Sequence, residues 1–232
     1  DAILRVTDGI MVARGDLGVE LPIEAVPARQ KQITRAARRF GRPVVVATQM
    51  LESMVEEPVP TRAEVSDVAT AVYEGADAVL LSAESATGQW PEKAVQTMDR
   101  VAQNVERDAH YKSIIHAQRT DPEATIADAI SAAARSVAET LQLPAIVCYT
   151  GSGQTGLRVA RERPNMPILA LTPIAQTARR LCLTWGMHCV LCEDQQNLDD
   201  MFSKAGEIAH NEGLAGKGDK IIIVGVDGNS DA

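Results

Sequence analysis

Three short polar segments each follow an apolar stretch, at the place where a strand is predicted to end. They occupy residues 13–18 (ARGDLG), 47–50 (ATQM) and 82–88 (SAESATG). The carboxyl ends of parallel strands meet at one edge of a sheet or barrel, and ligands bind at that edge. The sequence therefore predicts that these three segments contribute to one site.

Four side chains in these segments could do chemistry, and each also has a plainer role open to it. Asp16, which lies between two glycines, could bind a hard cation or could hydrogen-bond its own turn. Thr48 could donate or relay a proton, or could satisfy the end of a strand. Glu84 could be buried and hydrogen-bonded, or exposed. Arg14 could hold an anion, or could pair with an acid on a neighbouring helix.

A glycine-rich segment, residues 151–156 (GSGQTG), lies between a predicted strand and a predicted helix. It fits the G-x-G-x-x-G pattern of dinucleotide sites. Such sites also need an acid at the end of the next strand, and here that strand ends in Leu171-Thr172-Pro173 without one. A phosphate is favoured over a dinucleotide, because free N–H groups and hydroxyls converge at a helix N-terminus. A tight turn that only needs glycine is the remaining alternative.

The elements that must position the first three segments form three β/α units. The middle predicted strand is nearly all valine, which is typical of a strand buried on both faces of a parallel sheet. Thr61 and Glu64 form a capping box, and Pro91 suits the first position of a helix. Strands are predicted at residues 9–13, 43–47 and 76–81, and helices at residues 23–40, from Thr61 to Gly75, and from Pro91 onward.

The rest of the chain predicts a second α/β unit after a polar join at residues 110–124. We expect an α/β protein with two domains, residues 1–110 and 111–232. The first domain is expected to contain a parallel sheet of three strands. The second is expected to be an open sheet covered by helices. Its strands are predicted at residues 145–149, 167–171, 187–191 and 220–226, and its helices at residues 126–141, 156–163, 174–185 and 198–212.

The composition disfavours several classes of function. The net charge is −8 and aromatic residues make up 3% of the chain, whereas a nucleic-acid binder needs a basic face or stacking rings. No apolar run is long enough to span a membrane. Cys189 and Cys192 form a C-x-x-C pair, but a strand places them on opposite faces and only His188 is near as a third metal ligand. Three of the four cysteines lie in or beside apolar runs, where reduced and buried thiols are expected.

These motifs together carry a resemblance to a known family. Residues 13–18, 47–54 (ATQMLESM) and 60–69 (PTRAEVSDVA) resemble pyruvate kinase in their order and spacing, and residues 81–88 (LSAESATG) are similar to the family's next loop. The resemblance covers nearly the whole chain, and it implies that the first domain is the last three units of a TIM-type barrel, since the three predicted strands are too few to close an eight-stranded one. It implies a cytoplasmic enzyme, a homotetramer when complete, that transfers a phosphoryl group from phosphoenolpyruvate to ADP with Mg²⁺ and commonly K⁺.

The resemblance also implies roles for individual residues. Asp16 would be one of two carboxylate ligands of the Mg²⁺, and the backbone at Gly15 and Asp16, beside Arg14, would hold the substrate. Thr48 would contact the substrate near the proton that is delivered to the enolate. The surrounding proton-relay network would include two further residues, Ser82 and Glu84.

The glycine-rich segment of the second domain resembles the family's loop for an effector phosphate. The effector would be a sugar phosphate or AMP, bound far along the chain from Asp16, so its effect on catalysis would be allosteric. The residues expected to hold its phosphate are Thr150, Ser152, Gly153 and Thr155.

The chain departs from the family pattern in two places. Thr87 stands where the family usually has a lysine associated with the nucleotide, and residues 225–232 stop where the family continues through a glycine-rich loop to a final strand. The chain opens with Asp1 rather than Met, and the implied second Mg²⁺ carboxylate, catalytic lysine and K⁺ ligands are not found in it. We therefore expect a partial chain that is inactive alone. The alternative is a non-catalytic module that binds phosphorylated metabolites, or an inactive truncated product.

Overall fold

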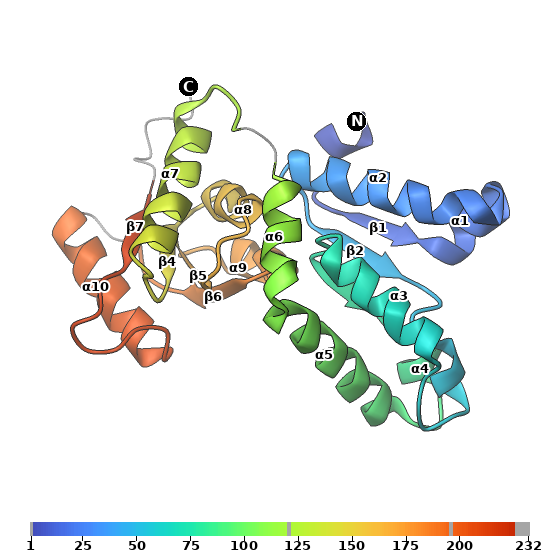
Figure 1. Cartoon of the computed structure of the whole chain (residues 1–232). Coiled ribbons are helices and arrows are strands. Elements are labelled where there is room, and N and C mark those ends of the chain that lie inside the picture. The colour runs from blue at the N-terminus through green and yellow to red at the C-terminus, as the bar shows by residue number, and fades with distance from the viewer. Residues whose placement is uncertain (1, 120–121, 195–196, 226–232) are drawn as a thin grey trace. The chain divides into compact units, whose positions relative to one another are not determined.

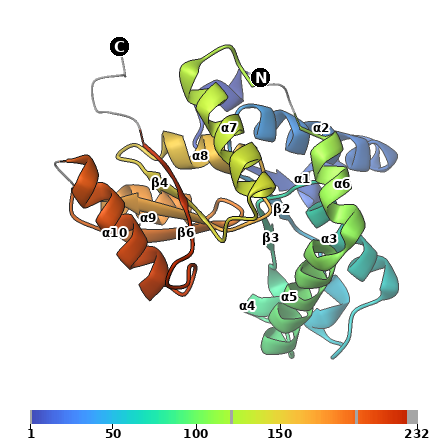
Figure 2. The same cartoon turned by 60° about the vertical axis from the view of Figure 1, so that its left-hand side comes forward.

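The computed structural model describes residues 2–119, 122–194 and 197–225. The chain divides into two compact units, Asp1–Arg119 and Thr120–Ala232. Figure 1 and Figure 2 show the two units from different sides, each built from parallel strands and covering helices. The observed fold class is the predicted one, α/β with parallel sheets and only part of a barrel.

The first unit contains a three-stranded parallel sheet in the order β1-β2-β3. Met11 of β1 lies beside Val45 of β2, which in turn lies beside Ala78 of β3. The central strand is β2, as expected from its run of valines. The strands are β1 (Ile10–Ala13), β2 (Val44–Ala47) and β3 (Ala78–Leu80), each at a predicted place and up to three residues shorter than predicted.

Helices of the first unit begin where the sequence provides the expected signals. Thr61 and Glu64 form the predicted capping box, and Pro91 lies in the first turn of its helix. Gly75, with a φ of 85°, follows the end of the helix that the capping box starts. The helical segments are η1 (Ile3–Arg5), α1 (Arg14–Glu20), η2 (Ile23–Ala25), α2 (Val26–Arg39), η3 (Glu52–Val55), α3 (Arg62–Tyr73), α4 (Ala83–Ala86), α5 (Pro91–Arg107) and α6 (Ala109–Ala117).

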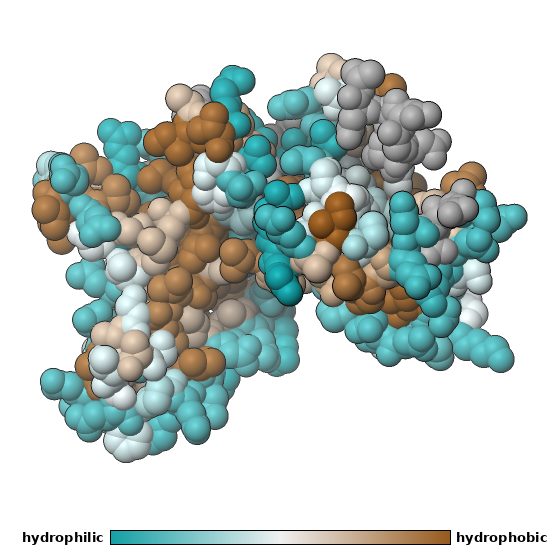
Figure 3. Space-filling model, turned by 180° about the vertical axis from the view of Figure 1, so that it is seen from behind, coloured by the Kyte–Doolittle hydropathy of each residue, from teal (hydrophilic) through white to brown (hydrophobic). Residues whose placement is uncertain are grey.

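The two faces of the first sheet differ sharply in burial. Val12 and Val44 are buried in one apolar cluster with Ala37 of α2, and Val46 is buried in another with residues of α3 and α5. On the opposite face Met11 is 57% exposed and Leu80 is 39% exposed. Figure 3 shows apolar residues gathered on the side of this unit that is turned away from the viewer in Figure 1. Among the described residues, no helix or strand covers this apolar face of the sheet.

The predicted loose join at residues 110–124 is wrong over its first part, because α6 occupies it. Asp108 caps this helix by accepting a hydrogen bond from the His110 N–H. Tyr111 and Ile115, four residues apart and so on one helix face, are both buried. The Tyr111 ring packs against that of Tyr73 on α3. This i, i+4 apolar pair was the sequence signal for a helix within an otherwise polar stretch.

The second unit is an open parallel sheet in the order β6-β5-β4-β7, with helices on both faces. Ile146 and Ile168 pack in one apolar cluster with residues of α7 and α8, while Val147 and Leu169 pack in another with residues of α10. The elements are α7 (Ile126–Thr140), β4 (Ile146–Tyr149), α8 (Gln154–Arg161), β5 (Ile168–Thr172), α9 (Ala175–Leu181), β6 (Met187–Leu191), α10 (Leu198–Asn211) and β7 (Ile222–Val224).

Every residue of β5 is buried, as expected for an inner strand of a doubly covered parallel sheet. The predicted final strand is shorter than expected, and residues 226–232 lie outside the described ranges. Within those ranges, no helix combines the length and the apolar character needed to cross a bilayer.

Candidate functional site

Asp16 lies in a helix rather than in the predicted glycine loop. β1 ends at Ala13 and α1 begins at the next residue, so Asp16 is in the first turn of α1, where a helix favours a carboxylate. The Asp16 side chain is exposed. In the part of the chain that the structure describes, it makes neither a hydrogen bond nor an ion pair, and so does not bond its own turn.

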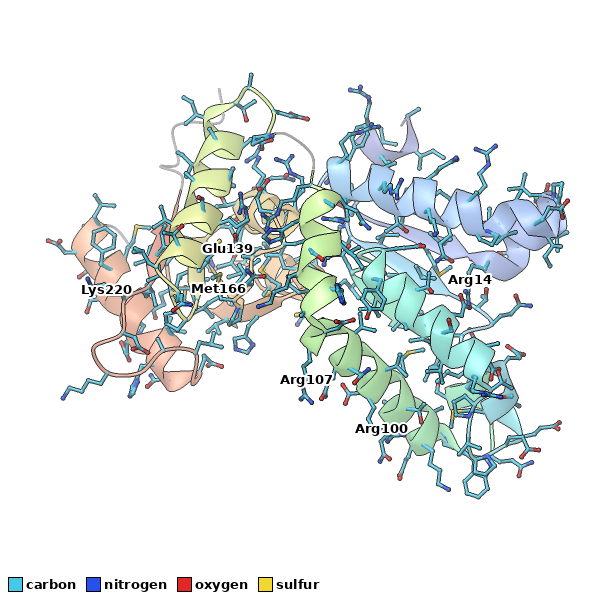
Figure 4. The ribbon with its side chains drawn as sticks, in the orientation of Figure 1. Arg14, Arg100, Arg107, Glu139, Met166 and Lys220 are labelled. Atoms are coloured by element: carbon cyan, nitrogen blue, oxygen red, sulfur yellow. The ribbon has the colours of Figure 1, made fainter. Side chains whose placement is uncertain are left out.

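Arg14 holds the segment that follows β2, from a buried position. Only 8% of Arg14 is exposed. Its Nη2 donates to the carbonyl oxygens of Thr48 and Gln49 at 2.6 and 2.8 Å, and its Nη1 pairs with the Asp67 carboxylate on α3. Figure 4 labels Arg14 beside α3. Of the two alternatives that the sequence left open, pairing with an acid on a neighbouring helix is the one observed.

The backbone after β2 takes a conformation that most residues avoid. Thr48 and Gln49 have φ angles of 69° and 52°, in the left-handed region that is costly for a β-branched residue. The Thr48 hydroxyl accepts a hydrogen bond from the Gly15 N–H at 2.9 Å and donates one to the Ala47 carbonyl at 2.6 Å. These bonds and the Arg14 contacts together hold Thr48 in its strained conformation. The hydroxyl thus satisfies the strand end and also ties β2 to α1.

Glu84 is fully buried and hydrogen-bonded, which settles the alternative that the sequence left open. Its Oε1 accepts a hydrogen bond from the Leu51 N–H at 3.1 Å, and its Oε2 accepts one from the Ser82 N–H at 2.7 Å. Glu84 lies in the short helix α4, which follows β3, so it connects the ends of β2 and β3. Because backbone N–H groups bind both carboxylate oxygens, Glu84 holds the backbone at Leu51 and Ser82 in place.

Contacts of the backbone therefore join the three segments that the sequence singled out. Gly15 after β1 contacts Thr48 after β2, and Leu51 in turn contacts Glu84 after β3. The Asp16 side chain contacts none of them within the described ranges. These hydrogen bonds confirm the prediction that the three segments meet at one edge of the sheet.

Asp67 is a member of this network that sequence reasoning did not single out. It lies in the quoted PTRAEVSDVA motif, seven residues into a predicted amphipathic helix, on a turn that faces the strand ends. We expect Asp67→Ala to lower the free energy of unfolding by about 1–3 kcal/mol, because the Arg14 guanidinium would stay buried without its counter-charge. The expected loss is moderate because 38% of the Asp67 side chain is exposed, where water screens part of the charge.

Urea unfolding of the complete protein measures this effect, with the exposed neighbour Ser66→Ala as the matched control. If Asp67→Ala and Ser66→Ala unfold at the same urea concentration, the ion pair does not stabilise the turn after β2.

Glu64 joins the segment that follows β2 to the start of α3. Its carboxylate accepts hydrogen bonds from the Ser53 N–H and hydroxyl at 2.7 and 2.6 Å, as well as from Thr61. Burial alone raises the pKa of Glu64, but the bonds from Ser53 and Thr61 outweigh it and hold the pKa below its ordinary value. Because the folded-state pKa is the lower one, this stabilisation is present above the unfolded-state pKa. It is lost as the pH falls through the folded-state value.

The glycine-rich loop of the second unit is a hydrogen-bonded turn between β4 and α8. The Thr150 hydroxyl accepts a hydrogen bond from the Gly153 N–H at 2.8 Å, and Gly153 has a φ of 89°, which favours glycine. α8 begins at Gln154, two residues before the predicted start. Thr150 and Thr155 are each 7% exposed, whereas Ser152 is exposed. The four expected phosphate-holding residues therefore lie together at the N-terminus of α8.

Two side chains of α9 hydrogen-bond to this loop, and no sequence pattern predicted these contacts. The Thr177 hydroxyl donates to the Gly151 carbonyl at 2.8 Å, and the Arg180 guanidinium donates to the Ser152 carbonyl. A side chain at residue 153 would come within 3.2 to 3.4 Å of Arg180, Thr177 and Leu181, so close packing also requires glycine there. The acid that a dinucleotide site needs after β5 is absent from the sequence, which has Thr172 and Pro173 at that place.

The expectation that three of the four cysteines are buried is wrong. Cys148 alone is buried, Cys182 is exposed, and Cys189 and Cys192 are half-buried. Burial raises the pKa of Cys148 to about 12. No group of three His, Cys, Asp or Glu side chains within residues 2–119, 122–194 and 197–225 could hold a metal ion.

Comparisons with known proteins match both units of the chain. The barrel domain of pyruvate kinase matches residues 1–95, and the alpha/beta domain of pyruvate kinase matches residues 128–230. A curated pyruvate kinase from Methylorubrum extorquens is 60% identical over 224 residues, 97% of this chain and 47% of that protein. A pyruvate kinase from Agrobacterium vitis is 49% identical over 222 residues, 96% of this chain and 46% of that protein.

A solved structure agrees with these sequence matches. The crystal structure of a pyruvate kinase from Cryptosporidium parvum has a TM-score of 0.89 and 37% identity, and the match covers 97% of this chain and 46% of that one. The chain thus spans about half the length of the relatives it matches.

The fold and the site define an α/β protein of the class that carries polar side chains at the carboxyl ends of parallel barrel strands. Within that class, the chain belongs to the pyruvate kinase family.

Proposed function

We propose that this chain is the C-terminal half of a pyruvate kinase, which transfers the phosphoryl group of phosphoenolpyruvate to ADP and yields pyruvate and ATP. The observation that carries the proposal is a set of hydrogen bonds, in which Arg14 and Gly15 bond to Thr48 and Glu84 bonds to the Leu51 N–H. It lies at the carboxyl ends of three adjacent parallel strands in a chain of this family. Phosphoryl transfer depends mainly on positioning and on electrostatic stabilisation, which such a rigid group provides.

The uncovered face of the first sheet supports a barrel that is completed by further strands. A three-stranded sheet with Met11 and Leu80 exposed has apolar surface to bury, and a closed barrel buries it against the remaining strands. We propose that the first unit is the C-terminal part of the catalytic barrel and the second a regulatory domain. We further propose that the complete enzyme is a cytoplasmic homotetramer.

The residues present fit one part of a Mg²⁺ site. Asp16 offers an exposed carboxylate without a partner in the described ranges, and Mg²⁺ in phosphoryl-transfer enzymes is held by only one or two protein carboxylates. Glu84 cannot be the second ligand while both its oxygens accept backbone hydrogen bonds. When bound, Mg²⁺ would neutralise charge that develops on the substrate. K⁺ is proposed on family membership alone.

The remaining residues are proposed to position the substrate and a proton. The backbone at Gly15 and Asp16 would hold the substrate carboxylate, since α1 begins there and a helix N-terminus favours an anion. The Gly15 N–H would exchange its bond to the Thr48 hydroxyl for one to the substrate. Thr48 would lie against the substrate, where its hydroxyl can pass a proton to the enolate. Arg14 acts on this site through Thr48. Ser82, whose N–H is held by Glu84, would complete the proton relay.

The proposed activity is tested by a coupled assay on the complete native polypeptide with phosphoenolpyruvate, ADP and Mg²⁺. Formation of pyruvate, read as lactate through lactate dehydrogenase, is the expected result. The 232 residues alone should give no pyruvate, because one Mg²⁺ carboxylate and no catalytic lysine cannot assemble the in-line geometry. If the complete polypeptide is inactive but still binds phosphorylated metabolites, the non-catalytic alternative holds.

We expect Thr48→Val to slow turnover by about 10²-fold, the ordinary contribution of a positioned proton donor. The side chain keeps its shape, but the hydroxyl that accepts the Gly15 N–H is lost. Thr48→Ser is the matched control and should retain most of the turnover. Enolate protonation is followed by solvent hydrogen exchange into pyruvate. An unchanged protonation rate in Thr48→Val would remove Thr48 from the relay.

The glycine-rich loop is proposed to bind the phosphate of a sugar phosphate or of AMP. Ser152 is exposed and lies just before the N-terminus of α8, and the helix dipole favours an anion there. We expect Ser152→Asp to weaken effector binding by at least about 10-fold, because its carboxylate repels the phosphate.

Calorimetric titration of the complete protein with fructose phosphates and with AMP measures this affinity. The matched control is Ser203→Asp, which adds the same charge at an exposed position on α10. Equal affinity in Ser152→Asp and the unmodified protein would leave the loop as a structural turn.

A further inference from the structure

Lys93 and Trp90 form a cation–π pair at the beginning of α5. The Lys93 ammonium lies 4.0 Å from the centre of the Trp90 ring, well inside the roughly 6 Å over which such a pair is attractive. Lys93 is exposed in the first turn of the helix, and within the described residues no acidic side chain pairs with it. The ring therefore holds the ammonium while its charge is not neutralised by the protein.

The Trp90 ring is itself fixed by the segment that follows β2. Its Nε1 donates to the Glu56 carbonyl at 3.2 Å, and the Gln89 N–H donates to the Val55 carbonyl at 2.8 Å. A side chain at residue 88 would come within 2.6 Å of a backbone carbonyl of α4, so the chain passes very closely there. These contacts fix the position of the ring, and through it the position of the ammonium.

The pair lies at the same edge of the sheet as the proposed site. Glu84, in α4 after β3, accepts a hydrogen bond from the Leu51 N–H, and the chain from α4 to Trp90 runs beside η3. α4 packs against both η3 and α5, and Figure 1 shows α4 next to the beginning of α5. Lys93 is the first basic residue that follows β3 along the chain.

A nucleotide at this edge needs a cation that the other polar segments do not supply. A diphosphate carries several negative charges, which phosphoryl-transfer enzymes neutralise with Lys, Arg and metal ions. The Arg14 guanidinium is buried and already bound to Asp67 and to backbone carbonyls. Thr87, which stands where the family usually has a lysine, is uncharged. An ammonium binds phosphate as a point charge, so Lys93 can supply the charge from a nearby position.

We propose that Lys93 binds a phosphate of the nucleoside diphosphate substrate and supplies the positive charge that Thr87 does not. Lys93 would then set the affinity for ADP, and Trp90 would act through it as a positioning residue. This inference rests on the proposed pyruvate kinase function.

The test uses steady-state kinetics and calorimetric titration with ADP on the complete native polypeptide. Lys93→Met should raise both the KM and the Kd for ADP by about 10-fold, the loss of one charge-assisted contact with a phosphate. The KM for phosphoenolpyruvate and kcat should stay within about two-fold, since this contact is made to the nucleotide alone. Lys93→Arg keeps the charge and should retain most of the affinity. Lys112→Met is the matched control, because it removes the same charge from an exposed position on α6.

Two further variants test how Lys93 is held and what it replaces. Trp90→Leu should raise the KM for ADP by about 3-fold, because the ammonium is no longer held over a ring. In the Lys93→Met background the same change should add nothing, since the ring acts through the ammonium. Thr87→Lys in that background should recover most of the affinity for ADP, because it returns a cation to the same loop.

The possible failures are distinguishable. An unchanged KM for ADP in Lys93→Met would overturn the inference and leave the proposed function standing. Equal rises in the KM for ADP and for phosphoenolpyruvate would also contradict it, since a general disturbance of the site would then be the cause. A complete polypeptide that neither forms pyruvate nor binds ADP would refute the proposed function, and this inference with it. Lys93 is exposed, so its variants should fold, and their circular dichroism spectra and urea midpoints verify that.

Discussion

Asp16→Ala in the complete enzyme should lower turnover by about 10³-fold or more. If Asp16 has the proposed role, the substitution removes a carboxylate from a cation that has few protein ligands, and such a cation contributes several kcal/mol of transition-state stabilisation. The Asp16 side chain is exposed and makes no hydrogen bond or ion pair within the described residues. Its loss should therefore leave the fold intact, and the defect should be chemical.

The matched control for Asp16 is Glu20→Ala, which removes an exposed acid from the other end of α1. Steady-state turnover is measured over a range of Mg²⁺ concentrations. Glu20→Ala should keep its turnover, whereas Asp16→Ala should need more Mg²⁺ and remain slow when Mg²⁺ is saturating. Turnover of Asp16→Ala close to that of the control would exclude Asp16 as a ligand.

Glu84→Ala should lower the free energy of unfolding by about 3–6 kcal/mol, the sum of two hydrogen bonds to a charged group at about 1.5–3 kcal/mol each. The carboxylate is fully buried and accepts from the Leu51 and Ser82 N–H groups, which would be left without an acceptor. A loss of this size is a large fraction of the stability of an ordinary domain. Turnover should fall as well, because the ends of β2 and β3 lose their connection.

Two variants separate the hydrogen bonds of Glu84 from the volume of its side chain. Glu84→Gln keeps the volume and one acceptor oxygen, so it should be intermediate in stability. Ser85→Ala changes an exposed neighbour in the same short helix. This variant should unfold at the same urea concentration as the unmodified protein. Urea unfolding measures all three, and amide hydrogen exchange should show lost protection at residues 51 and 82. Unchanged protection there in Glu84→Ala would mean that the two N–H groups have other acceptors.

The sequence by itself determined most elements of the fold, though neither α1 nor α6, and where the polar segments lie. The valine-rich β2, the capping box at Thr61 and Glu64, and Pro91 at the start of α5 are local signals, and each was read correctly. The reason is that strand burial and helix capping depend on residues close in the chain. Because the polar segments follow parallel strands, the sequence also predicted that they meet at one edge of the sheet.

Tertiary structure decided which alternative each polar side chain adopts. Arg14 is held by Asp67, 53 residues away in the chain, and Glu84 by the Leu51 N–H, 33 residues away. The sequence could not choose between an anion-binding and a paired arginine, since the choice depends on what the fold brings within hydrogen-bond distance.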